Sequence, residues 1–102
     1  MKIISIIVHE AAKQNILDSI AGINRIKGCY LYKVDGYFEG VGNNPFETQK
    51  DLVDGYTPRL RIDILVEKDV VTEVMDNIFE CTSCVKGRGV WYTRDIEDWG
   101  LM

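Results

Sequence analysis

Two cysteines three positions apart, Cys81 and Cys84, are the pair in this chain whose spacing most resembles that of a chemically active site. Thiolates at this spacing can supply half of a tetrahedral zinc site or close a redox-active disulfide. Lys86 and Arg88 follow the pair, and nearby cations favour the ionised thiolate. A complete zinc motif would show four ligands, whereas Cys29 lies in a distant segment. Three interpretations stay open: structural cysteines, a redox sensor, or a metal-binding sensor.

Residue types used in catalysis are present, but they do not form a recognisable motif. His9, the single histidine, stands where a strand should meet a helix, so we expect it to be a surface or capping residue. No serine, histidine and acid constellation is recognisable, and no nucleophile sits in a glycine motif. We therefore predict that the chain is not an enzyme.

Length and charge narrow the class of protein further. The 102 residues suit one domain, residues 1–102, and 46% of them are hydrophobic. The net charge of −4 argues against a nucleic-acid binder, which needs a basic face to neutralise phosphates. No run approaches the roughly 20 apolar residues of a membrane span, and "MKIISIIVHE" lacks the features of a signal peptide. We expect a soluble, cytoplasmic protein.

Hydrophobic periodicity predicts four strands and two helices. The strands are expected at Lys2–Val8, Gly28–Val34, Arg59–Val66 and Gly89–Ile96. Apolar residues recur at three- and four-residue steps from Glu10 to about Ile23, and again after Asp69, which can cap the second helix. The resulting β-α-β-β-α-β order is that of the ferredoxin-like α+β fold, a four-stranded sheet with two helices on one face.

The second face of that sheet is expected to be apolar and uncovered. The alternation in Arg59–Val66 turns Ile62 and Ile64 toward the helices, so Leu65 faces away from them. Other bulky residues expected on the uncovered face are Ile3, Ile7, Tyr30 and Tyr32. A homo-oligomer that packs sheet against sheet would cover this face. The alternative is a monomer with scattered exposed apolar side chains.

A long connection separates the second and third expected strands. It runs from Asp35 to Pro58, where a tight hairpin needs only about two to five residues. Its glycines, prolines and charges favour turns and mobility. Such a flexible loop is expected to contact a ligand or a partner, although a solvated loop without a role is the alternative.

Three segments carry a family resemblance. They are "KVDGYFEGVGN" at the start of the long loop, "PRLRIDILVEKDVVTEVMDNI" through the third strand and second helix, and "GRGVWYTRDI" into the last strand. In this order and at these spacings, the chain resembles the PII-like signalling proteins over nearly its whole length. The resemblance implies a homotrimer whose long loop contacts a partner and whose clefts between subunits hold an adenine nucleotide.

The resemblance also implies which residues bind the nucleotide. These are Ile6, Gly36, Leu65, Gly87, Arg88 and Gly89. Ile6 and Leu65 would surround the base, and Gly36 would lie at the base of the loop. In the "GRG" turn, the glycines let backbone N–H groups approach a phosphate, and the arginine can add a bidentate contact.

The chain departs from the best-known members of this family where the ligand is bound. Arg88 stands between the two glycines in place of aspartate, and Val90 follows them in place of lysine. Glu39 and Gly40 occur where those members have a glutamine that helps to hold magnesium and 2-oxoglutarate. With fewer cations for a triphosphate, ADP or AMP is favoured over ATP. These departures point to the groups associated with transport of bicarbonate or metals, so a membrane transporter is the expected partner.

Two further alternatives concern the remaining cations and thiols. Arg59 and Arg61 are expected to join Arg88 in a basic pocket for bicarbonate or another small anion; otherwise they lie on the exposed face of an edge strand. The alternative to a nucleotide sensor is a metal or redox sensor that uses Cys81 and Cys84 independently of nucleotide.

Overall fold

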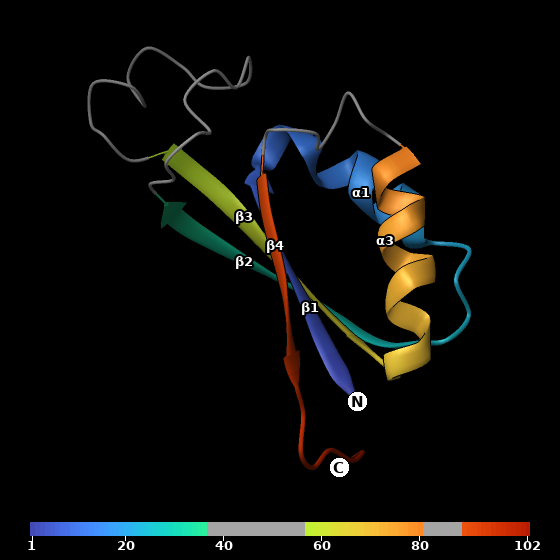
Figure 1. Ribbon diagram of the computed structural model, residues 1–102. Coiled ribbons are helices and arrows are strands. Elements are labelled where there is room, and N and C mark those ends of the chain that lie inside the picture. The colour runs from blue at the N-terminus through green and yellow to red at the C-terminus, as the bar shows by residue number, and fades with distance from the viewer. Residues whose placement is uncertain (37–56, 81–88) are drawn as a thin grey trace.

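The computed structural model in Figure 1 describes residues 1–36, 57–80 and 89–102. Its strands are β1 (Lys2–His9), β2 (Ile26–Gly36), β3 (Thr57–Val66) and β4 (Gly89–Asp95). Its α-helices are α1 (Lys13–Ile20) and α3 (Val71–Glu80), preceded by the 3-10 helices η1 (Glu10–Ala12) and η2 (Lys68–Val70). This order confirms the β-α-β-β-α-β pattern expected from the sequence.

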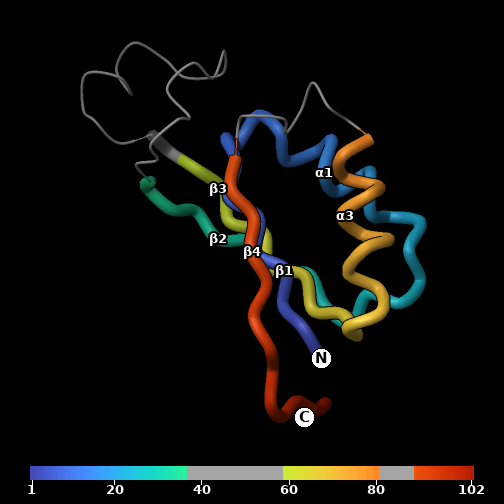
Figure 2. Tube along the Cα trace, in the orientation of Figure 1, coloured from blue at the N-terminus to red at the C-terminus, as the bar shows by residue number. Residues whose placement is uncertain are grey.

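The four strands form one antiparallel sheet in the order β2-β3-β1-β4. β1 and β3 are therefore the inner strands, and both helices lie against the same side of the sheet (Figures 1 and 2). The α+β class and its single helix-covered face are confirmed. We call the other side the outer face, and its central residues are Ile3, Ser5, Ile7, Tyr30, Tyr32, Arg61, Asp63, Leu65, Val90, Tyr92 and Arg94.

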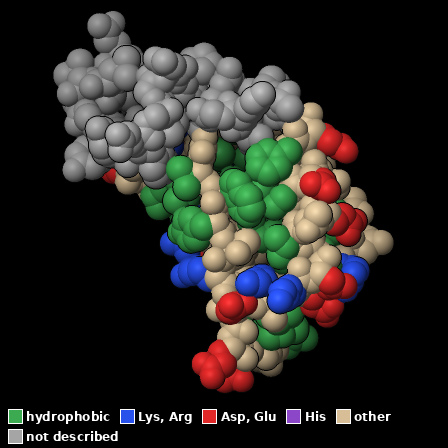
Figure 3. Space-filling model, viewed as in Figure 1, with side chains coloured by type: hydrophobic (Ala, Val, Ile, Leu, Met, Phe, Trp, Pro, Cys, Tyr) green, Lys and Arg blue, Asp and Glu red, His purple; other side chains and the backbone are tan. Residues whose placement is uncertain are grey.

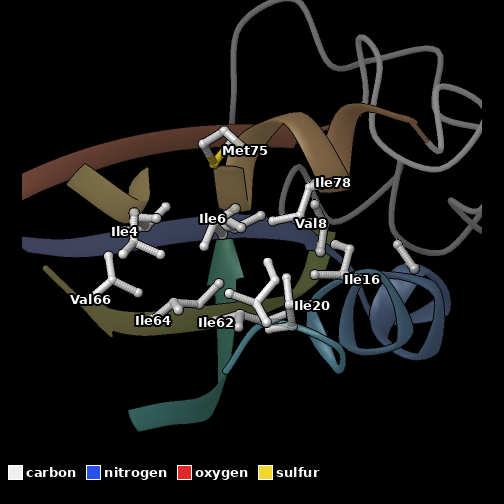
Figure 4. Close-up of a cluster of buried hydrophobic side chains, with 14 of the residues drawn as sticks. Ile4, Ile6, Val8, Ile16, Ile20, Ile62, Ile64, Val66, Met75 and Ile78 are labelled. Carbon is white, nitrogen blue, oxygen red and sulfur yellow. The ribbon is translucent and has the colours of Figure 1, made fainter. Parts of the chain in front are cut away.

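The hydrophobic core lies between the sheet and the two helices (Figure 4). Ile62 and Ile64 are fully buried there, as the alternation in β3 predicted, while Leu65 is only half-buried on the outer face. Burying an isoleucine completely stabilises the fold by about 1.5 to 3 kcal/mol. Among the described core residues, Ile4, Val66, Val70 and Val74 are likewise 0% exposed.

The first helical segment is shorter and less regular than expected. The structure has the 3-10 helix η1 and then α1, which ends at Ile20 and not near Ile23. The backbone N–H of Ile23 donates to the Ile20 carbonyl in a closing turn, and Ile23 stays buried although it is outside the helix. His9 caps η1, since its Nδ1 accepts a hydrogen bond from the Ala11 N–H at 3.1 Å, which confirms the expected capping role.

The second helical segment begins earlier than the expected cap at Asp69. Glu67 is the N-cap residue of η2, and it makes no side-chain capping bond. Asp69 lies inside η2 and accepts hydrogen bonds from the Arg25 guanidinium at 2.9 and 3.0 Å. The prediction that Asp69 caps the helix is therefore wrong, because its carboxylate is held by Arg25. In the described residues, no helix is long and apolar enough to cross a membrane.

The strands beside the long connection extend further than expected. Asp35 pairs with Pro58 and Gly36 pairs with Thr57, so the boundaries 35–58 expected for the loop are wrong by two residues at each end. The reason is that the antiparallel pairing of β2 with β3 continues past the apolar stretch that marked these strands. The expected loop thus shrinks to residues 37–56, which lie outside the described residues.

Candidate functional site

One end of the sheet gathers three of the residues expected to bind ligand. β2 ends at Gly36, beside the start of β3, and β4 begins at Gly89. The pairing of β1 brings Val8 opposite Gly89 and His9 opposite Arg59. Gly36 and Gly89 nevertheless lie on opposite edge strands, three strand spacings and therefore at least about 14 Å apart. They share an end of the sheet, here called the loop end, without touching.

Gly89 has a structural reason to be glycine. A Cβ atom at this position would lie 2.7 Å from the Ile7 carbonyl oxygen and 2.7 Å from Val8 Cγ1. Neither distance is tolerated by a real side chain, and the Ile7 oxygen belongs to the backbone of an inner strand. The close pairing of β4 with β1 therefore requires glycine here, whatever else the residue contacts.

A pocket at the loop end has a mixed charge. It is lined by Glu10, Lys33, Val34, Asp35 and Arg59, and its volume is about 190 Å³. Arg59 is 2% exposed, while Glu10, Lys33 and Asp35 are exposed. The lining residues carry charges of both signs, but they belong to two faces of the sheet: Arg59 pairs with Val34, whereas Lys33 pairs with the core residue Leu60. The basic pocket expected from Arg59, Arg61 and Arg88 stays a prediction, because Arg88 lies outside the described residues.

Arg61 does not line this pocket, because it is bound to a neighbouring carboxylate on the outer face. Its Nε donates to Asp63 Oδ1 at 2.9 Å and its Nη2 donates to Asp63 Oδ2 at 2.8 Å. The guanidinium also lies over the Tyr32 ring, 5.2 Å from its centroid. The alternative, in which the two arginines lie on the exposed face of an edge strand, is wrong, since β3 is an inner strand and Arg59 is buried.

Asp63 is the centre of a buried polar network on the outer face. The side chain of Ser5, on β1, donates to Asp63 Oδ1 at 2.7 Å, and both residues are almost completely buried. Burial by itself would raise the pKa of Asp63, but the hydrogen bonds from Arg61 and Ser5 outweigh it, and the pKa is lowered. The hydrogen bond to Asp63 in turn raises the pKa of Arg61. The pair is thus ionised, with its charges matched within the chain.

Apolar and aromatic side chains surround this network on the outer face. Tyr30, Tyr32 and Tyr92 are 53%, 47% and 39% exposed. Ile3, Ile7, Leu65 and Val90 are half-buried on the same face, which confirms the orientation predicted for the first three. The outer face therefore combines a satisfied polar centre with several exposed or half-buried apolar side chains, and an apolar patch of this kind commonly marks a surface that contacts another molecule.

A second aromatic group lies on the helix side of β4. Phe79 and Trp91 pack edge to face with their ring centroids 6.2 Å apart, and they are 42% and 46% exposed. Figure 3 shows hydrophobic side chains gathered over this part of the molecule, next to the position of β4 in Figure 1. Exposed apolar side chains thus occur on both sides of this edge strand.

The structure separates two residues that were expected to surround the nucleotide base. Ile6 is 3% exposed in the core, whereas Leu65 lies on the outer face. The Ile6 side chain packs between the sheet and the helices (Figure 4), so within one chain it lies on the other side of the sheet from Leu65. Its neighbour Ile7 is half-buried on the outer face, where it pairs with Arg61.

Leu65 is also far from the loop end within one chain. It lies six residues along β3 from Arg59, which is about 20 Å in an extended strand.

The remaining candidate residues lie outside the described part of the chain. These are Gly87 and Arg88, which were expected at the phosphates, and Cys81 and Cys84, which were expected to form a redox or metal site. Within the described part of the chain, no cluster of three or more histidine, cysteine, aspartate or glutamate residues could hold a metal ion. Cys29 is a free, exposed thiol whose pKa is raised by partial burial.

Sequence reasoning missed the contribution of Ser5 and Asp63 and of the acidic residues at the pocket. Ser5 and Asp63 are the polar residues within two otherwise apolar strand cores, a signal that could have suggested a pair across the sheet. Glu10 and Asp35 have no such signal, because isolated acidic residues near strand ends are usually solvated.

Comparisons with known proteins identify the fold. No family model matches the chain, and no curated protein matches its sequence. Among solved structures, a DUF3240 family protein from Shewanella baltica OS155 is similar, with a TM-score of 0.76. The alignment covers 99% of this chain and 94% of that protein, at 12% sequence identity. The similarity therefore shows a common fold over the whole length.

Proposed function

We propose that this chain is a non-enzymatic, PII-like regulatory protein of the cytoplasm that binds an adenine nucleotide, ADP or AMP more tightly than ATP. In this proposal, the nucleotide lies in clefts between the subunits of a homotrimer, with bicarbonate or another small anion as a second effector. Nucleotide binding changes how residues 37–56 interact with a partner protein. The proposed partner is a membrane transporter.

The observation that carries the proposal is the position of Leu65 relative to the loop end. Leu65 lies on the outer face, about 20 Å along β3 from the end where Gly36 and Gly89 lie. One nucleotide cannot contact all three residues of the same chain. It could contact them if the outer face of one subunit met the loop end of the next, as a cleft between subunits requires.

The composition of the outer face supports self-association. A small monomer rarely leaves several aromatic and aliphatic side chains together on one sheet face, and Tyr30, Tyr32 and Tyr92 are exposed there. The ion pair of Arg61 and Asp63 places matched charges at the centre of that face, so covering this centre would not bury an unpaired charge. A ring of three subunits related by rotation would cover three such faces with one kind of contact.

A regulatory role suits the described polar side chains better than a catalytic role. Ser5 donates its hydroxyl to Asp63, and His9 uses Nδ1 to cap η1. Both groups therefore support the fold. The residues that precede and follow 37–56, Gly36 and Thr57, are paired at the loop end, so a ligand bound there would contact the segment's anchors directly. A ligand can shift the segment's equilibrium only through such differential contacts.

Two measurements on the same samples test this proposal. Light scattering after size exclusion should give three times the 11.6 kDa chain mass. Calorimetry with ADP, AMP, ATP and cyclic AMP, with and without bicarbonate, should show tighter binding of ADP or AMP than of ATP. Leu65→Asp should lower both the assembled mass and the nucleotide affinity, because it places a charge on the outer face.

Leu101→Asp provides the matched control, since Leu101 is 92% exposed beyond β4. It should change neither the mass nor the affinity. Nucleotide binding by a monomer would contradict the placement of the site between subunits. If no adenine nucleotide binds at millimolar concentration, the nucleotide proposal is wrong and a metal or redox sensor takes its place. In that case, chelator or reductant should shift the melting temperature of the wild type but not of a Cys81→Ser, Cys84→Ser double variant.

A further inference from the structure

Phe79 and Trp91 form an exposed aromatic pair where α3 lies beside β4. Trp91 pairs with the core residue Ile6 on β1, so its ring is on the side of the sheet that faces the helices. This ring packs edge to face against Phe79, near the end of α3. Because the rings are 46% and 42% exposed, each can pack against the other and still contact a further molecule.

Three carboxylates lie on the solvent side of α3 beside this pair. Glu73, Asp76 and Glu80 follow one another at steps of three and four residues, so they share one face of the helix, and all three are exposed. We call them the acidic stripe. Phe79 is three residues from Asp76 and therefore its neighbour on the helix surface. Figure 3 shows acidic side chains along the position of α3, beside the hydrophobic group.

The charges of the acidic stripe are not neutralised within the part of the chain that the structure describes. α3 contains no lysine or arginine, and the three carboxylates form no ion pair with another described residue. Like charges three and four residues apart on a helix repel, and Glu80 lies at the negative end of the helix dipole. A cation bound along the stripe would therefore relieve this repulsion.

The combination of apolar and acidic surface selects the class of partner. An apolar partner alone would leave the carboxylates without counter-charges, and a simple cation would leave the two rings exposed to water. A segment that carries both apolar side chains and lysine or arginine satisfies both requirements, and its cations can also lie over the aromatic rings. A second copy of this chain matches the stripe less well, because its net charge of −4 opposes association with an acidic surface.

We propose that Phe79, Trp91 and the acidic stripe form a docking surface for a basic, amphipathic segment of another protein. Its apolar side chains pack on the two rings, and its lysine or arginine side chains bind the carboxylates of the stripe. Lysine and arginine are enriched at the cytoplasmic ends of membrane proteins, which suits the partner class of the proposed function. Only that class rests on the proposed function, since the docking surface requires neither a nucleotide nor residues 37–56.

Calorimetry with synthetic peptides tests the proposal on the wild-type protein. The probe is a helical peptide of about 14 residues with leucine on one face and lysine on the other. One counterpart has glutamate in place of lysine, and the other has glutamine in place of leucine. The probe should bind, less tightly as the salt concentration rises, and each counterpart should bind at least about fivefold more weakly. In Trp99→Phe, which leaves Trp91 as the one tryptophan, the fluorescence should change when the probe binds.

Replacing the aromatic part of the surface should weaken binding of the probe. Trp91→Thr should lower the affinity by at least about fivefold, because a tryptophan at the centre of a contact commonly contributes that much. Trp99→Thr is the matched control, since Trp99 is 45% exposed but lies beyond the end of β4. It should leave the affinity unchanged.

Replacing the acidic part tests the surface at exposed positions where the fold should be kept. Asp76→Asn combined with Glu80→Gln should lower the affinity for the probe by at least about threefold, as expected for two solvent-exposed charge pairs. Asp18→Asn combined with Glu10→Gln makes the same changes at exposed positions in α1 and η1. This control should bind the probe as tightly as the wild type.

The proposal is overturned if the probe does not bind at millimolar concentration, or if the glutamate peptide binds as tightly as the probe. It is also overturned if the surface variants bind like their controls. A lower assembled mass of Trp91→Thr in light scattering would overturn it as well, because the aromatic pair would then be a contact between subunits. A titration of the same samples with ADP separates the two proposals, since the docking surface and the nucleotide cleft can each be present without the other.

Discussion

Replacing Asp63 with alanine should destabilise the protein more than any surface substitution. The Asp63 side chain accepts hydrogen bonds from Ser5 and, twice, from Arg61, and the residue is 4% exposed. In Asp63→Ala, the Ser5 hydroxyl is left buried without its acceptor, which costs about 1 to 3 kcal/mol. Removing one partner of a buried ion pair costs about 3 to 5 kcal/mol.

The expected loss lies at the lower end of that range. The Arg61 side chain is 30% exposed, so water can partly replace its lost carboxylate. We therefore expect the free energy of unfolding to fall by about 3 kcal/mol, a large share of the roughly 5 to 15 kcal/mol of a typical domain. Urea unfolding at two protein concentrations measures this loss and separates it from a change in assembly.

The same network predicts a dependence on pH. Because the pKa of Asp63 is lowered in the folded protein, its ionised form stabilises the fold above the unfolded pKa of about 3.9. This stabilisation is lost as the pH falls below that value toward the folded pKa. The wild type should therefore lose more stability than Asp63→Ala between pH 5 and the acid limit of folding.

Asp76→Ala is the control for this series, because Asp76 is an exposed aspartate on α3. It should change the free energy of unfolding by less than about 0.5 kcal/mol. Ser5→Ala should have a smaller effect in the Asp63→Ala background than in the wild type, since the two side chains share a hydrogen bond. A loss below about 1 kcal/mol in Asp63→Ala, or an unchanged pH dependence, would refute the role given to the network.

Two further substitutions test the packing of the sheet. Gly89→Ala should lower the melting temperature, because its Cβ would lie 2.7 Å from the Ile7 carbonyl oxygen, and overpacking costs about 1 to 3 kcal/mol. Gly22→Ala is its control, since nothing lies within 4 Å of a Cβ there; equal melting temperatures for the two variants would contradict the close-packing argument. Ile62→Ala should reduce the free energy of unfolding by about 2 to 5 kcal/mol, because Ile62 is fully buried. Leu65→Ala, on the half-buried outer face, should cost clearly less in the monomer, and similar losses at both sites would contradict the assignment of faces.

Part of the candidate site could be anticipated and part could not. The resemblance and the strand pattern singled out Arg59, Gly36 and Gly89, and the structure brings all three to the loop end. The same reasoning assigned Ile6 to a ligand, but Ile6 is in the core. A shift of one residue along β1 changes the face of the sheet, so a short motif match cannot decide between Ile6 and Ile7.

The sequence alone determined the type and order of the elements and the buried side of β3. Side chains alternate in a strand, so the spacing of Ile62 and Ile64 is enough to assign their face. The exact helix and strand ends were less predictable, because backbone pairing and capping extend or shorten elements without a change in hydrophobic pattern. Asp69 shows this, since a partner distant in sequence, Arg25, holds its carboxylate.

Only the tertiary structure decided which polar residues meet. Ser5 and Asp63 are 58 positions apart, and their hydrogen bond exists because β1 and β3 are neighbours in one register. Arg59 and Arg61 look alike in the sequence, yet Arg61 binds Asp63 at the centre of the outer face, whereas Arg59 is almost completely buried at the loop end. The physical reason is that local periodicity specifies the face of a side chain, whereas its partners are supplied by strands that pair across long sequence separations.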